Sequence, residues 1–184
     1  MGRAPGAAGP CAQAAEASGR TRTRIAWLIL RVPPDLCDVG AERAPEWFLF
    51  LTLAVKDGVI ERDTWGTDIV DELTPAESDP VIYKTRFSGF YRTELDELLR
   101  EWGVKHLIVT GCTTSICVES TIRDAFFRDY HCILLEDCAA EPMGQDLSRS
   151  NHEASVHLVK RIFGSVSSSA NFTAALDSAC AVTA

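Results

Sequence analysis

The sequence predicts an α/β domain in which helices cover both faces of a mainly parallel sheet. Short apolar runs alternate with segments of helical periodicity, the apolar runs carry few polar residues, and no internal repeat occurs. Strands that are buried on both faces read as continuous apolar runs, and strands that alternate with helices pair in parallel. At 184 residues, the chain is long enough for one domain with a sizeable core.

Five short segments are expected to form the sheet. Ile25 to Val32 reads as a buried strand that stops at Pro33 and Pro34. The strands that follow are expected at Val81–Lys84, His106–Thr110 and His131–Glu136, with a short edge strand at Ser165–Ser168. Helical patterns separate most of these runs, which favours crossover connections between parallel neighbours.

Apolar residues at helical spacing mark the helices. The clearest helix follows Thr93, the expected N-cap, and ends at Gly103. Its apolar residues recur at i, i+3, i+4 and i+7: Leu95, Leu98, Leu99 and Trp102. A second helix is expected from about Ile116 to Arg128, with an apolar side of Val118, Ile122, Ala125 and Phe126. A third follows a cap at Ser150 or Asn151 and carries Ala154, Leu158, Val159 and Ile162, and a further helix is expected over Pro45–Lys56.

The first 24 residues differ in composition from the rest of the chain. They are rich in Ala, Gly, Pro, Ser and Arg, and Glu16 is their only acidic residue. They contain no apolar segment of the kind that a secretory signal needs. We therefore expect a disordered or aberrant leader over residues 1–24, the folded domain over 25–176 and a short tail over 177–184.

Charge and cysteine content narrow the class of protein. The net charge of −8 and the lack of any Lys/Arg-rich stretch argue against nucleic acid or an anionic membrane as the main partner. No apolar run approaches the ~18 residues of a membrane span. Seven cysteines without a CxxC pair indicate free thiols in a reducing compartment, so a cytoplasmic location is expected.

No metal or nucleotide cofactor is expected. The four histidines are scattered without metal-ligand spacing. The sequence also contains neither G-x-G-x-x-G after a strand nor G-x-x-x-x-G-K-[ST], the two motifs that bind nucleotide phosphates at helix N-termini.

Three polar features follow the carboxyl ends of the predicted strands, where ligands bind in open parallel sheets. They are Lys84, the turn over residues 111–117, and the pair Glu136 and Asp137. Cys117 lies where this turn leads into a helix, and a helix N-terminus and a nearby lysine both favour thiolate over thiol. Cys117 is therefore a candidate nucleophile for acyl transfer. The residues alone favour another interpretation, in which Cys117 is a small buried side chain that packs at a helix start and Lys84 is a solvated charge.

Two motifs in this region resemble a known family. K-x-R-x-S-G-F over residues 84–90 precedes T-G-x-x-T-x-x-C-V-x-S-T-x-R-D-A over residues 110–125. This combination resembles the isochorismatase-like cysteine hydrolase superfamily, and within it the branch of ureidoacrylate amidohydrolases and streptothricin hydrolases. The likeness covers about residues 64 to 170, and it favours the interpretation of Cys117 as a nucleophile.

The resemblance implies a three-layer α/β/α fold and an Asp–Lys–Cys triad, of which Lys84 and Cys117 match two positions. It also implies a cis peptide bond between Cys112 and Thr113, and an oxyanion hole formed by the backbone N–H groups of Thr113 and Cys117. Phe90 and Tyr91 are expected to line a substrate pocket because they follow the lysine strand. The family implies a small-molecule substrate and often a homo-oligomer.

The triad Asp of the family has no counterpart here. In the family it ends the first strand, which lies in the middle of the sheet. No acidic residue occurs between Glu16 and Asp35, so the general base is missing whether Ile25–Val32 corresponds to the first or to the second family strand. The fold is therefore expected to be incomplete at its N-terminus.

Three functions are weighed on this basis. The first is cysteine-dependent hydrolysis of an amide or ureido C–N bond through a thioester. The second is a catalytically inactive protein of the same fold that serves as an oligomer partner or ligand binder. The third is vinyl-ether hydrolysis of the isochorismatase type, which needs no cysteine nucleophile and which Cys117 therefore disfavours.

Overall fold

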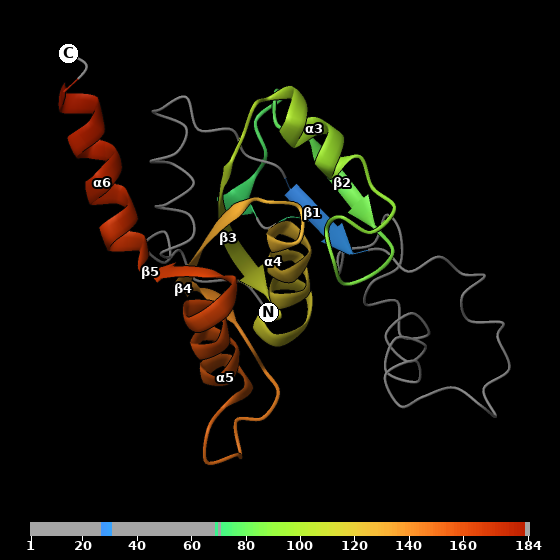
Figure 1. The fold of residues 1–184 in the computed structure, drawn as a ribbon, viewed down its shortest axis with the longest axis vertical. Coiled ribbons are helices and arrows are strands. Elements are labelled where there is room, and N and C mark those ends of the chain that lie inside the picture. The colour runs from blue at the N-terminus through green and yellow to red at the C-terminus, as the bar shows by residue number, and fades with distance from the viewer. Residues whose placement is uncertain (1–26, 31–68, 70, 183–184) are drawn as a thin grey trace, which may run out of the picture.

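The computed structural model describes residues 27–30, 69 and 71–182 (Figure 1). The strands in this part of the chain are β1 (Trp27–Leu30), β2 (Val81–Lys84), β3 (His106–Cys112), β4 (His131–Ala140) and β5 (Gly164–Ser167). All described strand pairs are parallel: β1 pairs with β2, and β4 pairs with both β3 and β5. The register shifts between Val109 and Gly111, just before the turn that carries Cys117.

Helices connect and follow these strands. They are α3 (Leu95–Glu101), α4 (Glu119–Phe126), α5 (Asn151–Leu158) and α6 (Ser169–Val182). A π-helical turn, η5 (Thr114–Val118), leads into α4, a second one, η6 (Val159–Phe163), extends α5, and a short 3-10 turn, η4 (Asp71–Leu73), precedes β2. None of the described helices combines the length and the apolar character that crossing a membrane requires.

Both faces of β4 are buried, each against a different helical layer. Cys132 and Leu134 belong to the main core, which also holds Ile122 and Ala125 of α4. Leu135, the next residue along the strand, lies in a second cluster, against which Phe172 of α6 packs. Because side chains alternate between the faces of a strand, these clusters lie on opposite sides of the sheet. The predicted α/β fold with a parallel sheet is confirmed.

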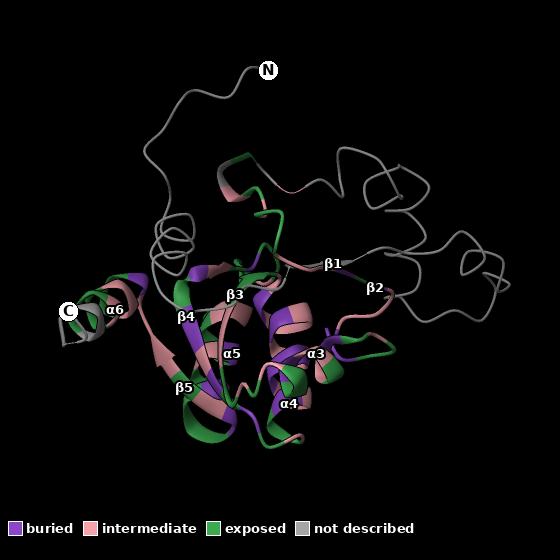
Figure 2. Cartoon of the chain, turned by 90° about the horizontal axis from the view of Figure 1, so that it is seen from above, coloured by how far each residue is buried: buried purple, intermediate pink, exposed green. Residues whose placement is uncertain are grey.

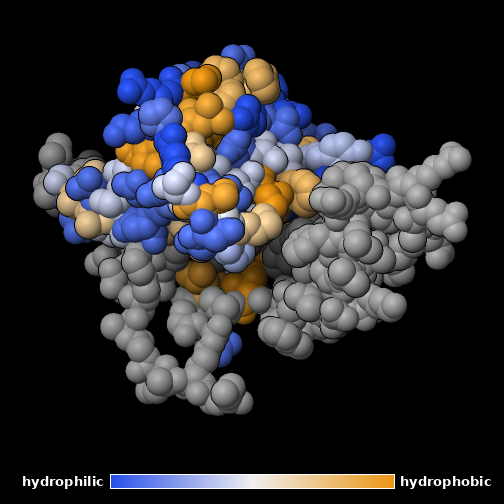
Figure 3. Space-filling model, turned by 90° about the horizontal axis from the view of Figure 1, so that it is seen from below, coloured by the Kyte–Doolittle hydropathy of each residue, from blue (hydrophilic) through white to orange (hydrophobic). Residues whose placement is uncertain are grey.

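Buried residues concentrate where the helices meet the sheet, whereas turns and outer helix faces are exposed (Figure 2). The large apolar side chains that do reach solvent are Tyr83, Tyr91, Phe126, Phe127, Met143, Leu147 and Ile162. On the face drawn in Figure 3, apolar side chains gather in several groups with hydrophilic ones between them.

The described strands form two sheets, one of β1 and β2 and one of β3, β4 and β5. In the views of Figures 1 and 2, β1 lies between β2 and β3. Within the described residues, β3 pairs along one edge only, and its apolar residues Leu107, Ile108 and Val109 are partly exposed, unlike the fully buried Leu134 and Leu135 of β4. The expected absence of a central strand concerns residues outside the described part of the chain and stays a prediction.

Most expected elements occur where the sequence places them. The strand at Val81–Lys84 has the predicted bounds, and those predicted at residues 106 and 131 extend further, to Cys112 and Ala140. Ser150 is the N-cap of α5 and forms a capping box with Glu153. Gly103 ends α3 with a φ of 66°. The helix expected over Pro45–Lys56 and the leader over 1–24 lie outside the described residues.

Three details of the helices differ from the expectation. The N-cap of α3 is Glu94, although the Thr93 hydroxyl oxygen accepts a hydrogen bond from the Leu95 amide at 3.4 Å and donates one to the carbonyl oxygen of Gly89. Phe126, expected on the buried side of its helix, is 42% exposed. In the last predicted helix, Ala154 and Ile162 are exposed, and the buried positions are Ser155, Val159 and Phe163. The π-helical turn η6 changes the residue spacing there, since its hydrogen bonds close over five residues instead of four.

Helix α6 runs through the domain end that was expected at residue 176. Its start is fixed by Asp137, whose carboxylate accepts hydrogen bonds from the Ser169 amide at 2.8 Å and from the Ser169 hydroxyl at 2.6 Å. Sequence periodicity did not reveal this helix, because its residues are mostly small and carry a single charge.

The burial of two isoleucines on helical turns predicts a large difference in how much each contributes to the free energy of unfolding. Ile122 is fully buried, whereas Ile162 is 56% exposed. Ile122→Ala should lower the free energy of unfolding by about 2–5 kcal/mol, because it removes buried methyl groups and leaves a cavity. Ile162→Ala, the matched control, should change it by less than about 1 kcal/mol. Urea denaturation measures both, and equal losses would contradict the assignment of the core.

Candidate active site

The site is built around Lys84, the last residue of β2. Its side chain is 4% exposed, and Nζ donates hydrogen bonds to the backbone oxygens of Arg86 at 3.2 Å and Phe87 at 3.0 Å. Cys117 lies close enough to Lys84 to act on the pKa of the ammonium, both electrostatically and through hydrogen bonding. Two residues 33 positions apart in the sequence are therefore brought together at the carboxyl ends of β2 and β3.

Burial lowers the pKa of the Lys84 ammonium, because a low-dielectric environment disfavours the charged form. Cys117 and Cys112 act in the opposite direction, since negative charge on a nearby sulfur stabilises the ammonium. Among the described residues, these two cysteines are the charged partners that bear on this lysine. The register partner of Lys84 in β1 is Leu30, an apolar residue. The described part of the site thus pairs a buried cation with a thiol and not with a carboxylate.

The turn that carries Cys117 has an unusual backbone. The peptide bond between Cys112 and Thr113 is cis, which is the geometry that the family resemblance implies. The carbonyl oxygen of Thr113 accepts hydrogen bonds from the amides of Ile116 at 3.3 Å and Val118 at 3.1 Å. Cys117 is partly buried in the π-helical turn that follows and is a free thiol. Of the other described cysteines, Cys112 is exposed, and Cys132 and Cys138 are buried.

A buried carboxylate holds this turn in place. Glu141 is 7% exposed and accepts hydrogen bonds from the Ser115 amide at 2.9 Å, the Ser115 hydroxyl and the Met143 amide at 3.1 Å. Burial opposes ionisation of Glu141, but the hydrogen bonds from Ser115 and Met143 outweigh it and hold the pKa of this carboxyl below its usual value. The Ser115 amide is therefore occupied by Glu141.

A second contact fixes the same turn from α5. The hydroxyl of Thr114, which is fully buried, lies 3.0 Å from Nδ1 of His152. His152 also acts electrostatically on Glu141 and favours its charged form. The turn between β3 and α4 is thus held by the segment after β4 and by the first turn of α5.

The aromatic residues expected in a substrate pocket lie in different environments. Phe90 is 5% exposed and belongs to the main core, where its ring stacks on Tyr130 at a centroid distance of 5.9 Å. Phe90 thus takes part in core packing, and its expected part in a substrate pocket stays a prediction. Tyr91 is 40% exposed, with Arg86 and Arg92 placed over its ring. Its part in substrate binding stays a prediction.

A cavity of about 430 Å³ lies at the opposite end of the sheet. It is lined by residues from the starts of β3, β4 and β5, among them His106, His131 and Gly164. Neither Lys84 nor Cys117 contributes to its lining. The cavity therefore lies apart from the site of Lys84 and Cys117. Among the described residues, no group of three or more His, Cys, Asp or Glu side chains is placed to hold a metal ion.

The model of the isochorismatase domain family matches residues 3–171 of this chain. The chain belongs to the isochorismatase family. The match begins well before the motifs around Lys84 and Cys117, so it extends further toward the N-terminus than the sequence resemblance described above. The domain limits expected at residues 24 and 176 stay predictions.

Curated relatives of this isochorismatase-family chain are named as amidohydrolases. The chain is 35% identical over 174 residues to ureidoacrylate amidohydrolase RutB of a strain of Methylorubrum extorquens, an alignment that covers 91% of this chain and 68% of the relative. It is 42% identical over 114 residues to RutB of a strain of Pantoea ananatis, covering 62% of this chain and 44% of the relative. These names support the assignment of the chain as a hydrolase.

Solved structures share the fold. A cysteine hydrolase from Pseudomonas syringae pv. phaseolicola superimposes with a TM-score of 0.77 at 25% identity, covering 92% of this chain and 79% of that one. An N-carbamoylsarcosine amidase from Thermoplasma acidophilum gives a TM-score of 0.67 at 26% identity, covering 87% and 80%. The similarity therefore includes most of the chain.

Sequence reasoning placed Lys84 and Cys117 in the site but missed the residues that hold the turn between them. The contact between Ser115 and Glu141 spans 26 positions of the sequence, and the contact between Thr114 and His152 spans 38. The residue types involved are also common on protein surfaces. The strand predicted at this place ends at Glu136, five residues before Glu141, so the sequence pattern gave no sign of this contact. The contact itself depends on how the strands pair, which local sequence patterns do not give.

Glu141→Gln should destabilise the protein in a pH-dependent way. Because the pKa of Glu141 is lower in the folded state, its charged form stabilises the fold above the unfolded pKa of about 4.3, and this contribution is lost as the pH falls through the folded pKa. At neutral pH the substitution should cost about 1–3 kcal/mol, the range for hydrogen bonds to a charged group. At a pH below the folded pKa the variant and the parent should differ much less.

Urea denaturation at neutral and at acidic pH measures this difference. Glu136→Gln, on the exposed side of the adjacent strand, is the matched control and should change stability by less than about 0.5 kcal/mol at either pH. A loss for Glu141→Gln that is the same at both pH values would mean that its charge plays no part in holding the turn.

Proposed function

We propose that this chain is a cysteine-dependent hydrolase of an amide or ureido C–N bond in a small molecule. The observation that carries the proposal is the contact between Cys117 and the buried ammonium of Lys84 at the carboxyl ends of two parallel strands. An ammonium beside a sulfur favours the thiolate, which is the nucleophilic form of cysteine. The names of the RutB relatives support a ureido or amide carbonyl as the electrophile.

The reaction proceeds in two steps. The Cys117 sulfur attacks the carbonyl carbon and forms a C–S bond, and the C–N bond breaks as the leaving nitrogen takes up a proton. Water then attacks the thioester, the C–S bond breaks, and the acid product and the free Cys117 are released. Lys84 stabilises the thiolate before the attack and again when the acyl group leaves.

The backbone amides of Thr113 and Cys117 are the proposed donors to the oxyanion. Thr113 is extended, with φ −90° and ψ 144°, and directly precedes the turn. The amides of Ser115, Ile116 and Val118 already donate to Glu141 or to the Thr113 carbonyl, so the proposed donors are other amides of this turn. Donors fixed in advance stabilise the tetrahedral intermediate more than mobile ones, because they need no reorganisation during the reaction.

Proton transfer is the weak part of this site. A positioned general acid–base contributes about 10²–10⁴ in rate, and no described carboxylate bears on Lys84. Asp137, a carboxylate that follows the predicted fourth strand, already accepts hydrogen bonds from Ser169 at the start of α6. An inactive protein of the same fold is therefore the second candidate function, and the experiment below separates it from the first.

We expect this chain to form an acyl-enzyme with activated esters but to hydrolyse amides slowly or not at all. Activated esters carry a good leaving group that needs no proton, so the thiolate alone suffices for acylation. An amide needs protonation of its leaving nitrogen, and deacylation needs a base for water. Intact-mass spectrometry under single-turnover conditions should detect one acyl group on Cys117, and steady-state amide hydrolysis should be at least ~100-fold below that of a chain with the missing base.

The matched comparison is the same chain with a family-type first strand ending in Asp placed before residue 25. This variant should gain amide turnover that Cys117→Ala abolishes. Efficient amide turnover by the unmodified chain, lost in Cys117→Ala, would show that another residue acts as the base. Absence of acylation in both chains would instead favour the inactive protein.

A further inference from the structure

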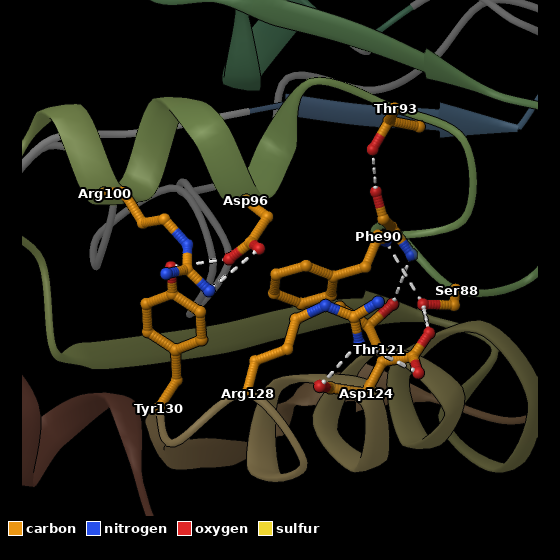
Figure 4. A network of polar contacts seen from close by, with 10 residues as sticks. Ser88, Phe90, Thr93, Asp96, Arg100, Thr121, Asp124, Arg128 and Tyr130 are labelled. Atoms are coloured by element: carbon orange, nitrogen blue, oxygen red, sulfur yellow. Dashed lines mark hydrogen bonds and ion pairs between the residues drawn. The ribbon is translucent and has the colours of Figure 1, made fainter.

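The loop after β2 encloses the Lys84 ammonium. The two carbonyl oxygens that accept from Nζ belong to Arg86 and Phe87, the second and third residues after the lysine. Where this ammonium lies relative to Cys117 therefore depends on where the loop is held. Residues 88–90, which follow directly, are fastened to the helix that follows Cys117 (Figure 4).

Thr121 makes the central contact between the loop and the helix. Its hydroxyl oxygen accepts a hydrogen bond from the Gly89 amide at 2.9 Å and donates one to the carbonyl oxygen of Cys117 at 2.7 Å. Thr121 is 6% exposed, so water does not readily replace either bond. One hydroxyl thus joins the backbone of the lysine loop directly to the backbone of the candidate nucleophile.

Two further contacts support the same attachment. The Ser88 hydroxyl donates to the carboxylate of Asp124, one turn after Thr121 in α4, and accepts from the Phe90 amide at 3.1 Å. Asp124 also pairs with Arg128 at 3.1 Å, and the Arg128 guanidinium lies 4.9 Å from the centre of the Phe90 ring. In Figure 4, the side chains of Thr121 and Asp124 from α4, and of Arg128 just after its end, point toward the loop over residues 88–90.

We propose that Thr121 is a positioning residue that, with Ser88, locks the lysine loop onto the nucleophile helix and so keeps the Lys84 ammonium beside the Cys117 sulfur. Thr121 touches neither the sulfur nor Nζ, and it acts through the Gly89 amide and the Cys117 carbonyl. The proposal deepens the function inferred above and rests on Cys117 as the reactive thiol. The titratable groups that act on Lys84 in the described structure are Cys117 and, from β3, Cys112, and Asp124 and Glu141 hold the flanking segments.

Breaking this attachment should slow the reaction of Cys117 without substrate. The measurement is the rate of iodoacetamide labelling at Cys117 in the full-length chain, followed by peptide mapping over a pH series. Thr121→Val, which keeps the shape and removes the hydroxyl, should lower the rate at neutral pH by about three- to tenfold, the factor equivalent to one net hydrogen bond. It should also move the labelling profile to higher pH, because the thiolate loses part of its cation.

Conservative and matched variants separate positioning from a general loss of stability. Thr121→Ser keeps the hydroxyl and should label like the parent, and Ser88→Ala should label slowly in the same way as Thr121→Val. Thr173→Val is the control, because the Thr173 hydroxyl makes the same type of bond, to the Ser169 carbonyl at 3.0 Å, on helix α6. It should leave Cys117 labelling unchanged.

The proposal is wrong if Thr121→Val and Ser88→Ala label Cys117 at the parental rate and with the parental pH profile. It is also wrong if Thr173→Val slows labelling as much as they do, since general loosening would then explain the effect. If Thr121→Val does not fold, Ser88→Ala and Thr121→Ser carry the test. Labelling requires no substrate, so failure here is distinct from failure of ester acylation, which tests the proposed hydrolase.

Discussion

The burial of one ammonium beside one thiol is the constraint on which the rest of this site depends. A lysine that is 4% exposed has lost most of its hydration. In the described structure, two hydrogen bonds to backbone carbonyls and the proximity of Cys117 take the place of that water. Burial of a charge is costly unless hydrogen bonds and an opposite charge compensate it. The lysine loop, the cis peptide at Cys112–Thr113 and the Glu141 contact to Ser115 all serve to place these groups together.

The sequence predicted the parts of this fold that depend on local patterns. The apolar run ending in Lys84, the glycine after α3 and the capping box at Ser150 each state a local preference that the structure fulfils. The Lys84–Cys117 pair was predicted through the family resemblance and the rule that parallel strands end at one edge of a sheet. Phe126 and Ile162 were misassigned because helical spacing alone does not reveal which side of a helix faces the sheet, and η6 changes that spacing.

The residues that fix the site were not predictable in the same way. Thr121 and Ser88 act across 32 and 36 positions of sequence, and Glu141 acts across 26. Their types are common at helix starts and on loops, so nothing local distinguishes them. Ser88 belongs to the first of the two motifs and Thr121 to the second. Their contacts join the loop after Lys84 to the helix after Cys117.

The pairing of strands in the two described sheets bears on the triad Asp that the sequence is expected to lack. The β3 strand ends in the turn that carries Cys117, yet among the described residues it pairs only with β4, and the register partner of Lys84 is Leu30. Among the described residues, the groups that stabilise the charge of Lys84 are Cys117 and Cys112, which ties the state of the lysine to that of the thiol.

The most direct test of this account is the titration of the Lys84 ammonium by NMR of isotopically labelled lysine in the parent chain and in Cys117→Ala. The account predicts that the pKa of Lys84 in the parent lies below that of a free lysine, because burial disfavours the charge. In Cys117→Ala this pKa should fall further, since the sulfur that favours the ammonium is gone. A Lys84 that titrates like a surface lysine, or that is unaffected by the loss of Cys117, would contradict the pairing on which the proposed function rests.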